Sequence, residues 1–198
     1  MSRAPNLEAR EKIVKAAYGL MYARGFKDVS MDEVAEAAGL KKANLFHYYP
    51  TKEALGLAVF DYASVQMRAK VEERFSKESD PIRSVEGMFT EVVDGMEASC
   101  CTGGCFAGNL AQELSDHFEK MRVKVSSYLK AWTSHVAASL ERGRERGYFR
   151  KDMKCKESAE AIVSLFEGAT LVCKANKETK PLANAKDMAV SYLKGYKT

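Results

Sequence analysis

One short stretch near the N-terminus is rich in hydrogen-bond donors and lacks acids. Between residues 41 and 51 there is no carboxylate, and the exposed chemistry comes from Lys41, Lys42, Asn44, His47 and Tyr48. A segment that lies among phosphates is expected to carry such donors, because they bind phosphate oxygens or the edges of bases. The pattern favours recognition of nucleic acid over catalysis.

Helix start and stop signals surround these residues. Ser30 is a good N-cap, and Glu33 three residues later completes a capping box. Gly39 is placed to end that helix at its C′ position, and Pro50 halts a second helix that begins at Lys41. Thr51 caps a third helix. Two short helices around a glycine-containing turn predict a helix-turn-helix, whose second helix enters the DNA major groove.

The run A-x-x-A-G-L-x-x-x-x-L-F-x-Y-Y-P-T-K-E-A-L, from residue 35 to residue 55, resembles the DNA-binding segment of the TetR family of bacterial repressors. An upstream Y-A-R-G-F extends the resemblance to residues 9–57. Lys52 matches the family's lysine that contacts the DNA backbone. The predicted DNA-binding residues are Ser30, Lys41, Lys42, Asn44, Phe46, His47, Tyr48 and Lys52.

The sequence departs from the family pattern at three of these positions. Lys41 stands where the family usually has Ser or Thr, Phe46 where it has Tyr, and Tyr48 where it has His. Phe46 lacks a hydroxyl that could bond a phosphate, whereas Tyr48 keeps a donor. Leu45 and Tyr49 are four residues apart and are expected to face inward, with Phe46 beside them.

Length and charge fit a small DNA-reading region joined to a larger helical body. The 198 residues carry a net charge of +4, of which +3 falls within residues 1–52. We expect a helix-turn-helix region over 1–52 and a helical ligand-binding and dimerisation domain over 53–198. The N-terminus has no apolar signal segment and no run suits a membrane helix, so a soluble, cytoplasmic protein is expected.

Apolar periodicity predicts an all-α fold of about nine helices, with no β pattern. Besides the helix-turn-helix, the expected helices cover residues 7–24, 52–76, 82–99, 105–114, 117–146, 156–176 and 182–196. Asp80 and Pro81 are expected to start the helix at 82–99. Small residues at Gly168 and Ala169 allow close helix packing, either within one subunit or, as the family implies, between two copies in a homodimer that binds palindromic double-stranded DNA.

Three cysteines, Cys100, Cys101 and Cys105, form the second chemical feature. Cys105 opens a helix after two glycines, where the helix dipole is expected to lower its pKa and make a thiolate available. The segment from Gly104 to Asp116 also resembles an electrophile-responsive subgroup of the family, in which Cys105 falls on the reactive cysteine and Lys174 on a lysine near it.

Several interpretations of this cluster stay open. Cys105 is either a sensor of electrophiles or a packing residue, and the three thiols are an alternative site for a soft metal or metalloid. No zinc pattern, phosphate-binding loop or carboxylate pair is present, so neither a cofactor nor catalysis, even by a cysteine-dependent enzyme, is expected. The sequence therefore predicts a TetR-type repressor, released from a palindromic operator by a small-molecule inducer or by cysteine modification.

Overall fold

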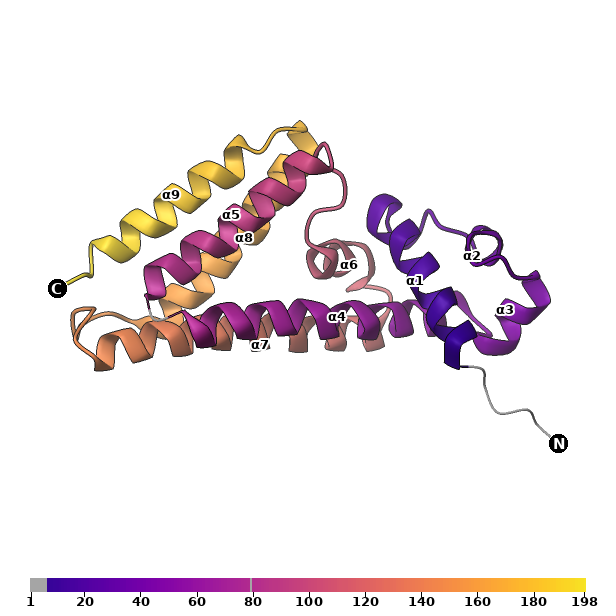
Figure 1. The fold of residues 1–198 in the computed structure, drawn as a ribbon, viewed down its shortest axis with the longest axis horizontal. Coiled ribbons are helices and arrows are strands. Elements are labelled where there is room, and N and C mark those ends of the chain that lie inside the picture. Colours follow the sequence, from indigo (N-terminus) through magenta and orange to yellow (C-terminus); the bar gives the residue numbers. More distant parts are fainter. Residues whose placement is uncertain (1–6, 79) are drawn as a thin grey trace. The chain divides into compact units, whose positions relative to one another are not determined.

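The computed structural model describes residues 7–78 and 80–198, and over these it is all-helical (Figure 1). Two parts of the chain lie outside the described residues. One is Ser79, between the helices expected at 52–76 and 82–99, and the other is residues 1–6, in the N-terminus expected to lack a signal segment. The described chain forms nine α-helices, as the periodicity predicted. Their bounds are α1 Leu7–Arg24, α2 Met31–Ala37, α3 Lys42–Tyr48, α4 Lys52–Lys77, α5 Pro81–Ala98, α6 Phe106–Leu114, α7 Glu119–Glu145, α8 Cys155–Asn176 and α9 Lys180–Lys194.

The chain divides into two compact units. Unit 1 comprises residues 1–67 and 109–125, and unit 2 comprises residues 68–108 and 126–198. Helices α4, α6 and α7 each contain residues of both units. In the part of the chain that is described, no helix has the length and apolarity needed to cross a bilayer.

Unit 1 is built around the first three helices, with α1 packed on α2 and α2 packed on α3. Its core takes one face from each element, because apolar residues recur there at helical spacing. The fully buried side chains include Ile13, Met21, Leu45, Leu55, Phe60 and Met121. Lys124 at the start of α7 forms an exposed ion pair with Asp61 of α4, at 2.6 Å. The core therefore holds the helix-turn-helix as a rigid element.

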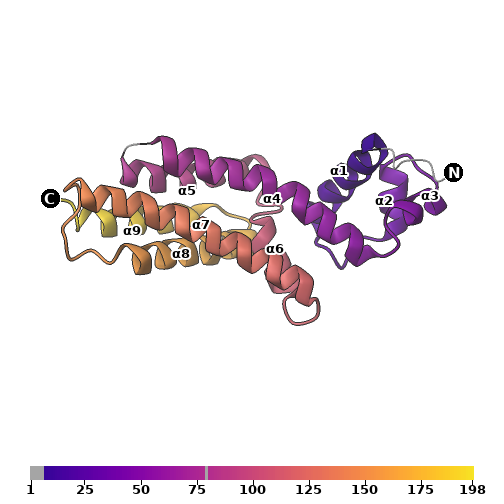
Figure 2. The same ribbon diagram turned by 90° about the horizontal axis from the view of Figure 1, so that it is seen from below.

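Unit 2 is a bundle in which α9 packs against both α5 and α8, as Figures 1 and 2 show. The start of α5 is well defined, because the Asp80 carboxylate accepts hydrogen bonds from the backbone N–H groups of Ile82, at 2.9 Å, and Arg83, at 3.2 Å. The same carboxylate accepts a hydrogen bond from the Tyr148 hydroxyl at 2.8 Å. Asp80 thus acts as the N-cap that the sequence predicted.

Candidate functional site

The turn between α2 and α3 has both predicted end signals. The Ser30 hydroxyl accepts from the Glu33 N–H at 3.2 Å, and the Glu33 carboxylate accepts from the Ser30 N–H at 2.8 Å, which makes a complete capping box. Gly39 has φ +63°, and the Leu40 N–H bonds back to the Ala35 carbonyl at 2.9 Å. This pattern is a Schellman motif, which a residue with a β-carbon adopts only with strain.

An ion pair strengthens the start of α2. Arg24 at the end of α1 lies 2.7 Å from the Glu33 carboxylate. Its guanidinium, followed by the hydrogen bonds from Ser30, lowers the pKa of Glu33 to about 2. Glu33 therefore stays ionised at neutral pH, where its charge also suits the positive end of the α2 dipole.

Helix α3 has one buried and one exposed side. Leu45 is fully buried and Tyr49 nearly so, as expected, whereas Phe46 is 38% exposed and does not share their burial. On the exposed side lie Lys41, Lys42, Asn44 and His47, and Tyr48 is half-buried. The first residues of the helix have no side-chain cap, because Lys41 occupies the N-cap position without bonding to the backbone. The predicted donors thus share one accessible surface.

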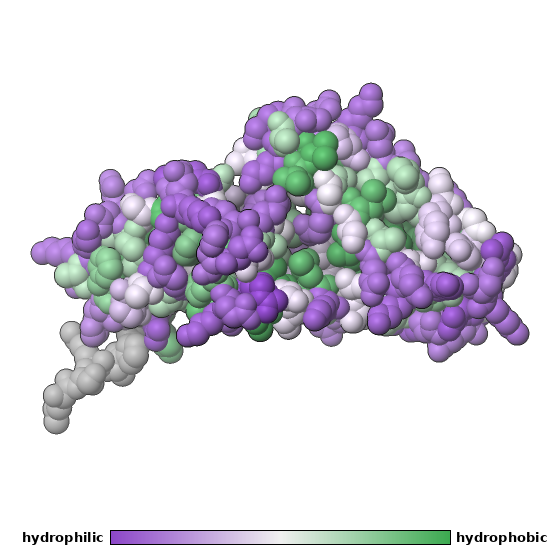
Figure 3. Space-filling view, turned by 180° about the vertical axis from the view of Figure 1, so that it is seen from behind, coloured by the Kyte–Doolittle hydropathy of each residue, from purple (hydrophilic) through white to green (hydrophobic). Residues whose placement is uncertain are grey.

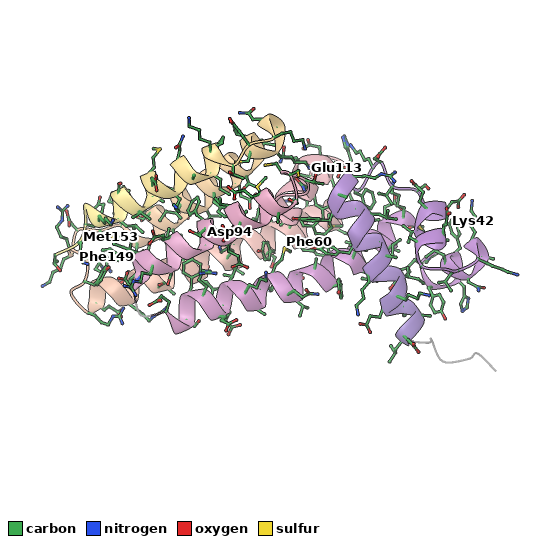
Figure 4. All side chains as sticks on the ribbon, turned by 45° about the horizontal axis from the view of Figure 1, so that its top comes forward. Lys42, Phe60, Asp94, Glu113, Phe149 and Met153 are labelled. Carbon is green, nitrogen blue, oxygen red and sulfur yellow. The ribbon has the colours of Figure 1, made fainter. Side chains whose placement is uncertain are left out.

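Lys42 has an internal partner on this surface. Its ammonium lies 2.8 Å from the Asp32 carboxylate of α2, and both side chains are 61% exposed (Figure 4). It also lies 5.9 Å from the centre of the Phe46 ring. An ion pair this exposed contributes little to stability, so the lysine can exchange the carboxylate for a phosphate at small cost.

Lys52 already has partners within the protein, unlike a lysine whose ammonium is free to bind a phosphate. Its ammonium donates to the Lys27 carbonyl at 2.9 Å and lies 4.9 Å from the centre of the Phe26 ring. Both partners belong to the loop between α1 and α2. Lys52 therefore supports this loop in addition to the DNA contact predicted for it.

The same loop is held by a residue that the sequence gave no reason to select. The two oxygens of Glu113 in α6 accept the backbone N–H groups of Phe26 and Lys27, each at 2.8 Å. Figure 4 shows Glu113 near the C-terminal end of α1. A carboxylate that accepts two backbone donors fixes both the position and the direction of the loop.

The cysteine segment is a tight turn. Cys100 and Cys101 have φ of 49° and 54°, and Gly103 and Gly104 also have positive φ. Cys100 is exposed, Cys101 is buried and Cys105 is intermediate. Cys105 is the N-cap of α6, because its sulfur accepts the Gly108 N–H at 3.4 Å. The residues described contain no group of three His, Cys, Asp or Glu side chains that could hold a metal ion, so the metalloid alternative has no ligand set in this arrangement.

The expected fall in the Cys105 pKa is wrong. Burial of the thiol, followed by the charge of the Glu167 carboxylate, holds the pKa of Cys105 well above its ordinary value, and the backbone N–H groups at the helix start only partly offset this. The predicted dipole effect is real but smaller than desolvation beside a like charge. The group that acts on the thiol is Glu167 of α8, not the expected Lys174.

Glu167 belongs to a mixed polar and aromatic group in unit 2, which we call the Glu167 cluster: Cys105, Tyr128, Trp132, Phe166 and Glu167. Burial raises the pKa of Glu167, and the hydrogen bond with Cys105 only partly offsets it. Burial, followed by the charges of Cys105 and Glu167, raises the pKa of Tyr128. Trp132 and Phe166 meet edge to face with ring centres 5.0 Å apart. The sequence offered a weak signal for this site, a single acid within the apolar run of α8.

Apolar side chains remain exposed on the last two helices. Leu171 and Val172 of α8 are 46% and 43% exposed, and Met188 and Tyr192 of α9 are 64% and 44% exposed. Hydrophobic surface bordered by hydrophilic residues is visible on the unit 2 part of the face in Figure 3. Of the small residues singled out earlier, Ala169 is buried and Gly168 is exposed. The helices thus keep an outward apolar surface besides their packing within the unit.

Comparison with known proteins gives a consistent picture. Residues 13–59 match the sequence family described as bacterial regulatory proteins, tetR family, and residues 81–189 match the tetracyclin repressor-like C-terminal domain. The chain is 25% identical over 195 residues to the HTH-type transcriptional repressor NemR of Escherichia coli (strain K12), covering 93% of this chain and 94% of that protein. It is 22% identical over 183 residues to the HTH-type transcriptional repressor DhaR of Mycobacterium sp. (strain GP1), covering 92% and 89%. The crystal structure of a regulatory protein TetR from Rhodobacter sphaeroides has the same fold, with a TM-score of 0.84, 23% identity and coverage of 92% and 97%.

Proposed function

The chain belongs to the TetR family of bacterial transcriptional regulators, and we propose that it is a homodimeric repressor that binds a palindromic operator. Proteins of this family are regulators of transcription and not enzymes. We assign operator reading to the region 1–52 and inducer binding and dimerisation to the region 53–198. The two-fold axis of the dimer accounts for a palindromic site.

The observation that carries this proposal is the exposed side of α3. Lys41, Lys42, Asn44 and His47 are accessible on a helix that has no acid of its own, and Leu45 anchors that helix in the core. The proposed DNA-binding set is completed by Ser30, Phe46, Tyr48 and Lys52. Asn and Lys are side chains that read base edges or bind phosphates in a major groove.

The first test is to select the sequences that the protein retains from random double-stranded DNA. A palindrome should emerge, and Asn44→Ala should weaken binding to it by about 1–3 kcal/mol if Asn44 makes a bidentate base contact. Lys52→Ala should reduce the slope of log affinity against log salt by about 1, whereas the exposed Lys151→Ala in unit 2 should leave it unchanged. If alanine variants of Lys42, Asn44 and His47 all keep full sequence discrimination, the recognition helix is wrongly assigned.

The dimer interface is proposed on the exposed apolar side of α8 and α9. Exposed apolar side chains such as Leu171 and Met188 support this assignment, because large apolar patches on a protein surface often mark a protein contact. Leu171→Glu should shift the protein from dimer to monomer in sedimentation equilibrium. The exposed Glu160→Gln on the same helix is the matched control. A dimer of unchanged stability in Leu171→Glu would place the interface elsewhere.

Release from DNA is proposed to follow binding of a small-molecule inducer in unit 2 or, as an alternative, modification of Cys105. What supports the alternative is the position of Cys105 as the N-cap of α6, where an added group must displace the Gly108 N–H. Cys100, Cys101 and Lys174 belong to the proposed sensor region. The raised pKa of Cys105 slows thiol reactions at neutral pH, so it favours the non-covalent route.

Cys105→Ser separates the two routes. Serine is a good N-cap, so the variant should fold and bind operator normally. Wild type and variant are titrated with operator before and after treatment with N-ethylmaleimide, with Cys100→Ser as the control for the exposed thiol. Selective resistance of Cys105→Ser supports covalent sensing. Equal release of all three proteins, or of none, assigns induction to a non-covalent ligand.

A further inference from the structure

Two buried polar atoms in unit 2 have no hydrogen-bond partner among the described residues: Oε1 of Glu167 and Nε1 of Trp132. Trp132 is only 4% exposed, so solvent does not satisfy its N–H. A buried polar group without a partner costs about 1–3 kcal/mol. One acceptor and one donor in the same cluster thus lack partners, which points to a binding site for a molecule that carries a complementary donor and acceptor.

The electrostatics define the charge of that molecule. The carboxylate of Glu167 is buried beside the thiol of Cys105 and near the hydroxyl of Tyr128, and all three groups have raised pKa values. Each of these groups is neutral or negative, so ionisation of one opposes that of the others. The Arg68 guanidinium partly offsets the pKa shift of Tyr128, whereas the pKa shift of Glu167 comes from burial and is partly offset by the hydrogen bond with Cys105. A positive charge placed at Glu167 relieves this opposition, whereas an anion adds to it.

The walls of the cluster are aromatic. The ring of Phe166 lies edge to face with Trp132 at 5.0 Å and with Phe89 at 5.2 Å, and Tyr128 lies 6.2 Å from Trp132 between ring centres. Aromatic faces carry negative electrostatic potential and attract cations, and they also stack on flat ligands. The room that Glu167 occupies depends on Gly108, because a β-carbon there would lie 2.2 Å from Oε2 of Glu167.

We propose that the inducer is a small aromatic cation, whose protonated amine or amidine binds the Glu167 carboxylate and whose acceptor atom binds the Trp132 indole N–H. This inference rests on the proposed function, because it names the ligand class of the same regulator. The cation supplies the donor that Oε1 lacks, and the aromatic body packs on Phe166 and Trp132. Tyr128 and Cys105 border the bound ligand.

The structure provides a built-in probe, because Trp132 is the only tryptophan in the sequence. Its fluorescence is followed while the protein is titrated with 4-hydroxybenzamidine, with neutral 4-hydroxybenzamide and with anionic 4-hydroxybenzoate. All three share one ring and one hydroxyl, whose oxygen is the acceptor for the Trp132 N–H. Tyramine with 4-ethylphenol is a second matched pair. Each cation should change the emission saturably and bind at least about tenfold tighter than its neutral analogue, since a hydrogen bond to a charged group exceeds a neutral one.

Glu167→Gln tests the partner directly. The amide keeps an acceptor and removes the charge, so the preference for 4-hydroxybenzamidine over 4-hydroxybenzamide should disappear while the protein stays folded. Glu160→Gln, an exposed change on the same helix, should keep the full preference. The proposal is overturned if neutral or anionic probes bind as tightly as the cations, if neither cation changes the Trp132 emission, or if Glu167→Gln keeps the preference.

Operator retention, measured separately, distinguishes this inference from the proposed function. Cation binding that depends on Glu167, together with release of the operator, supports both. Cation binding with no release assigns the site but contradicts its role in induction. If only a neutral compound releases the protein from the operator, the assignment as a repressor stands, but the proposal of a cationic inducer is refuted.

Discussion

Replacing Glu113 with alanine removes both acceptors that hold the loop between α1 and α2. The loss leaves the Phe26 N–H without a partner; because this group is only part-buried, the cost is about 1.5 kcal/mol, in the lower half of the range of about 1–3 kcal/mol for a buried group. The Lys27 N–H is exposed and turns to water, which costs roughly 0.5 kcal/mol. The two terms together predict a local loss of about 2 kcal/mol, or about a 30-fold rise in opening of the loop.

Amide hydrogen exchange measures this opening at the two residues concerned. In Glu113→Ala, protection of the Phe26 amide should fall by about 30-fold, and protection of Lys27 should fall less. Asp116→Ala removes an exposed carboxylate three residues further on and should leave both amides unchanged. Operator affinity should fall by no more than the same factor of about 30, because the binding free energy is reduced at most by the cost of closing the opened loop. Unchanged protection at Phe26 would refute the reasoning.

Two further outcomes follow from single contacts. Gly108→Ala places a β-carbon 2.2 Å from Oε2 of Glu167, so the carboxylate must shift and 4-hydroxybenzamidine should bind more weakly. In Gly95→Ala the β-carbon meets nothing within 4 Å, so this variant should keep binding and gain about 0.5–1 kcal/mol in urea unfolding. The low pKa of Glu33 means that its support for α2 is fully present above the ordinary value of 4.5 and is lost as pH falls towards about 2. The difference in unfolding midpoint between wild type and Glu33→Gln should therefore shrink over that interval, and a constant difference down to pH 2 would contradict the assignment.

Local signals predicted the DNA-reading elements well. Ser30, Glu33 and Gly39 act on neighbours within a few residues, so their pattern in the sequence carries most of their geometry. Asp80 with Pro81 defined the start of α5 in the same way. The burial of Leu45 and Tyr49 followed from their spacing, although Phe46 remained more exposed than expected.

Long-range contacts were beyond the sequence. Nothing near Glu113 indicates that its partners lie 86 and 87 residues earlier in the chain. The direction of the Cys105 pKa shift was predicted wrongly for the same reason. The sequence shows the start of the helix at Cys105, but it does not show burial of the thiol beside Glu167. The positive φ of Cys100 was also unforeseen, because residues with a β-carbon rarely adopt it. Sequence reasoning thus selected the cysteine segment, whose role as a sensor stays a prediction, but gave the wrong electrostatics for Cys105.

Helix α6 contains residues of both units, and we expect it to couple the proposed ligand to the helix-turn-helix. Its first turn includes Gly108, against Glu167, and its last turn carries Glu113, which holds Phe26 and Lys27. Nine residues of α-helix are about 13 Å long. The helices from Lys52 and from Glu119 also contain residues of both units.

Softening α6 should therefore weaken coupling without removing either site. Ala111→Gly lowers helix propensity by about 1 kcal/mol in the middle of α6, away from Gly108 and Glu113. The ratio of operator affinities without and with an effective inducer should fall, while cation binding at Trp132 changes little. Ala183→Gly in α9 is the matched control. A ligand shifts a two-state equilibrium only by its difference in affinity for the two states. An unchanged ratio in Ala111→Gly would mean that α6 does not transmit that difference, and would leave α4 and α7 as the other helices that contain residues of both units.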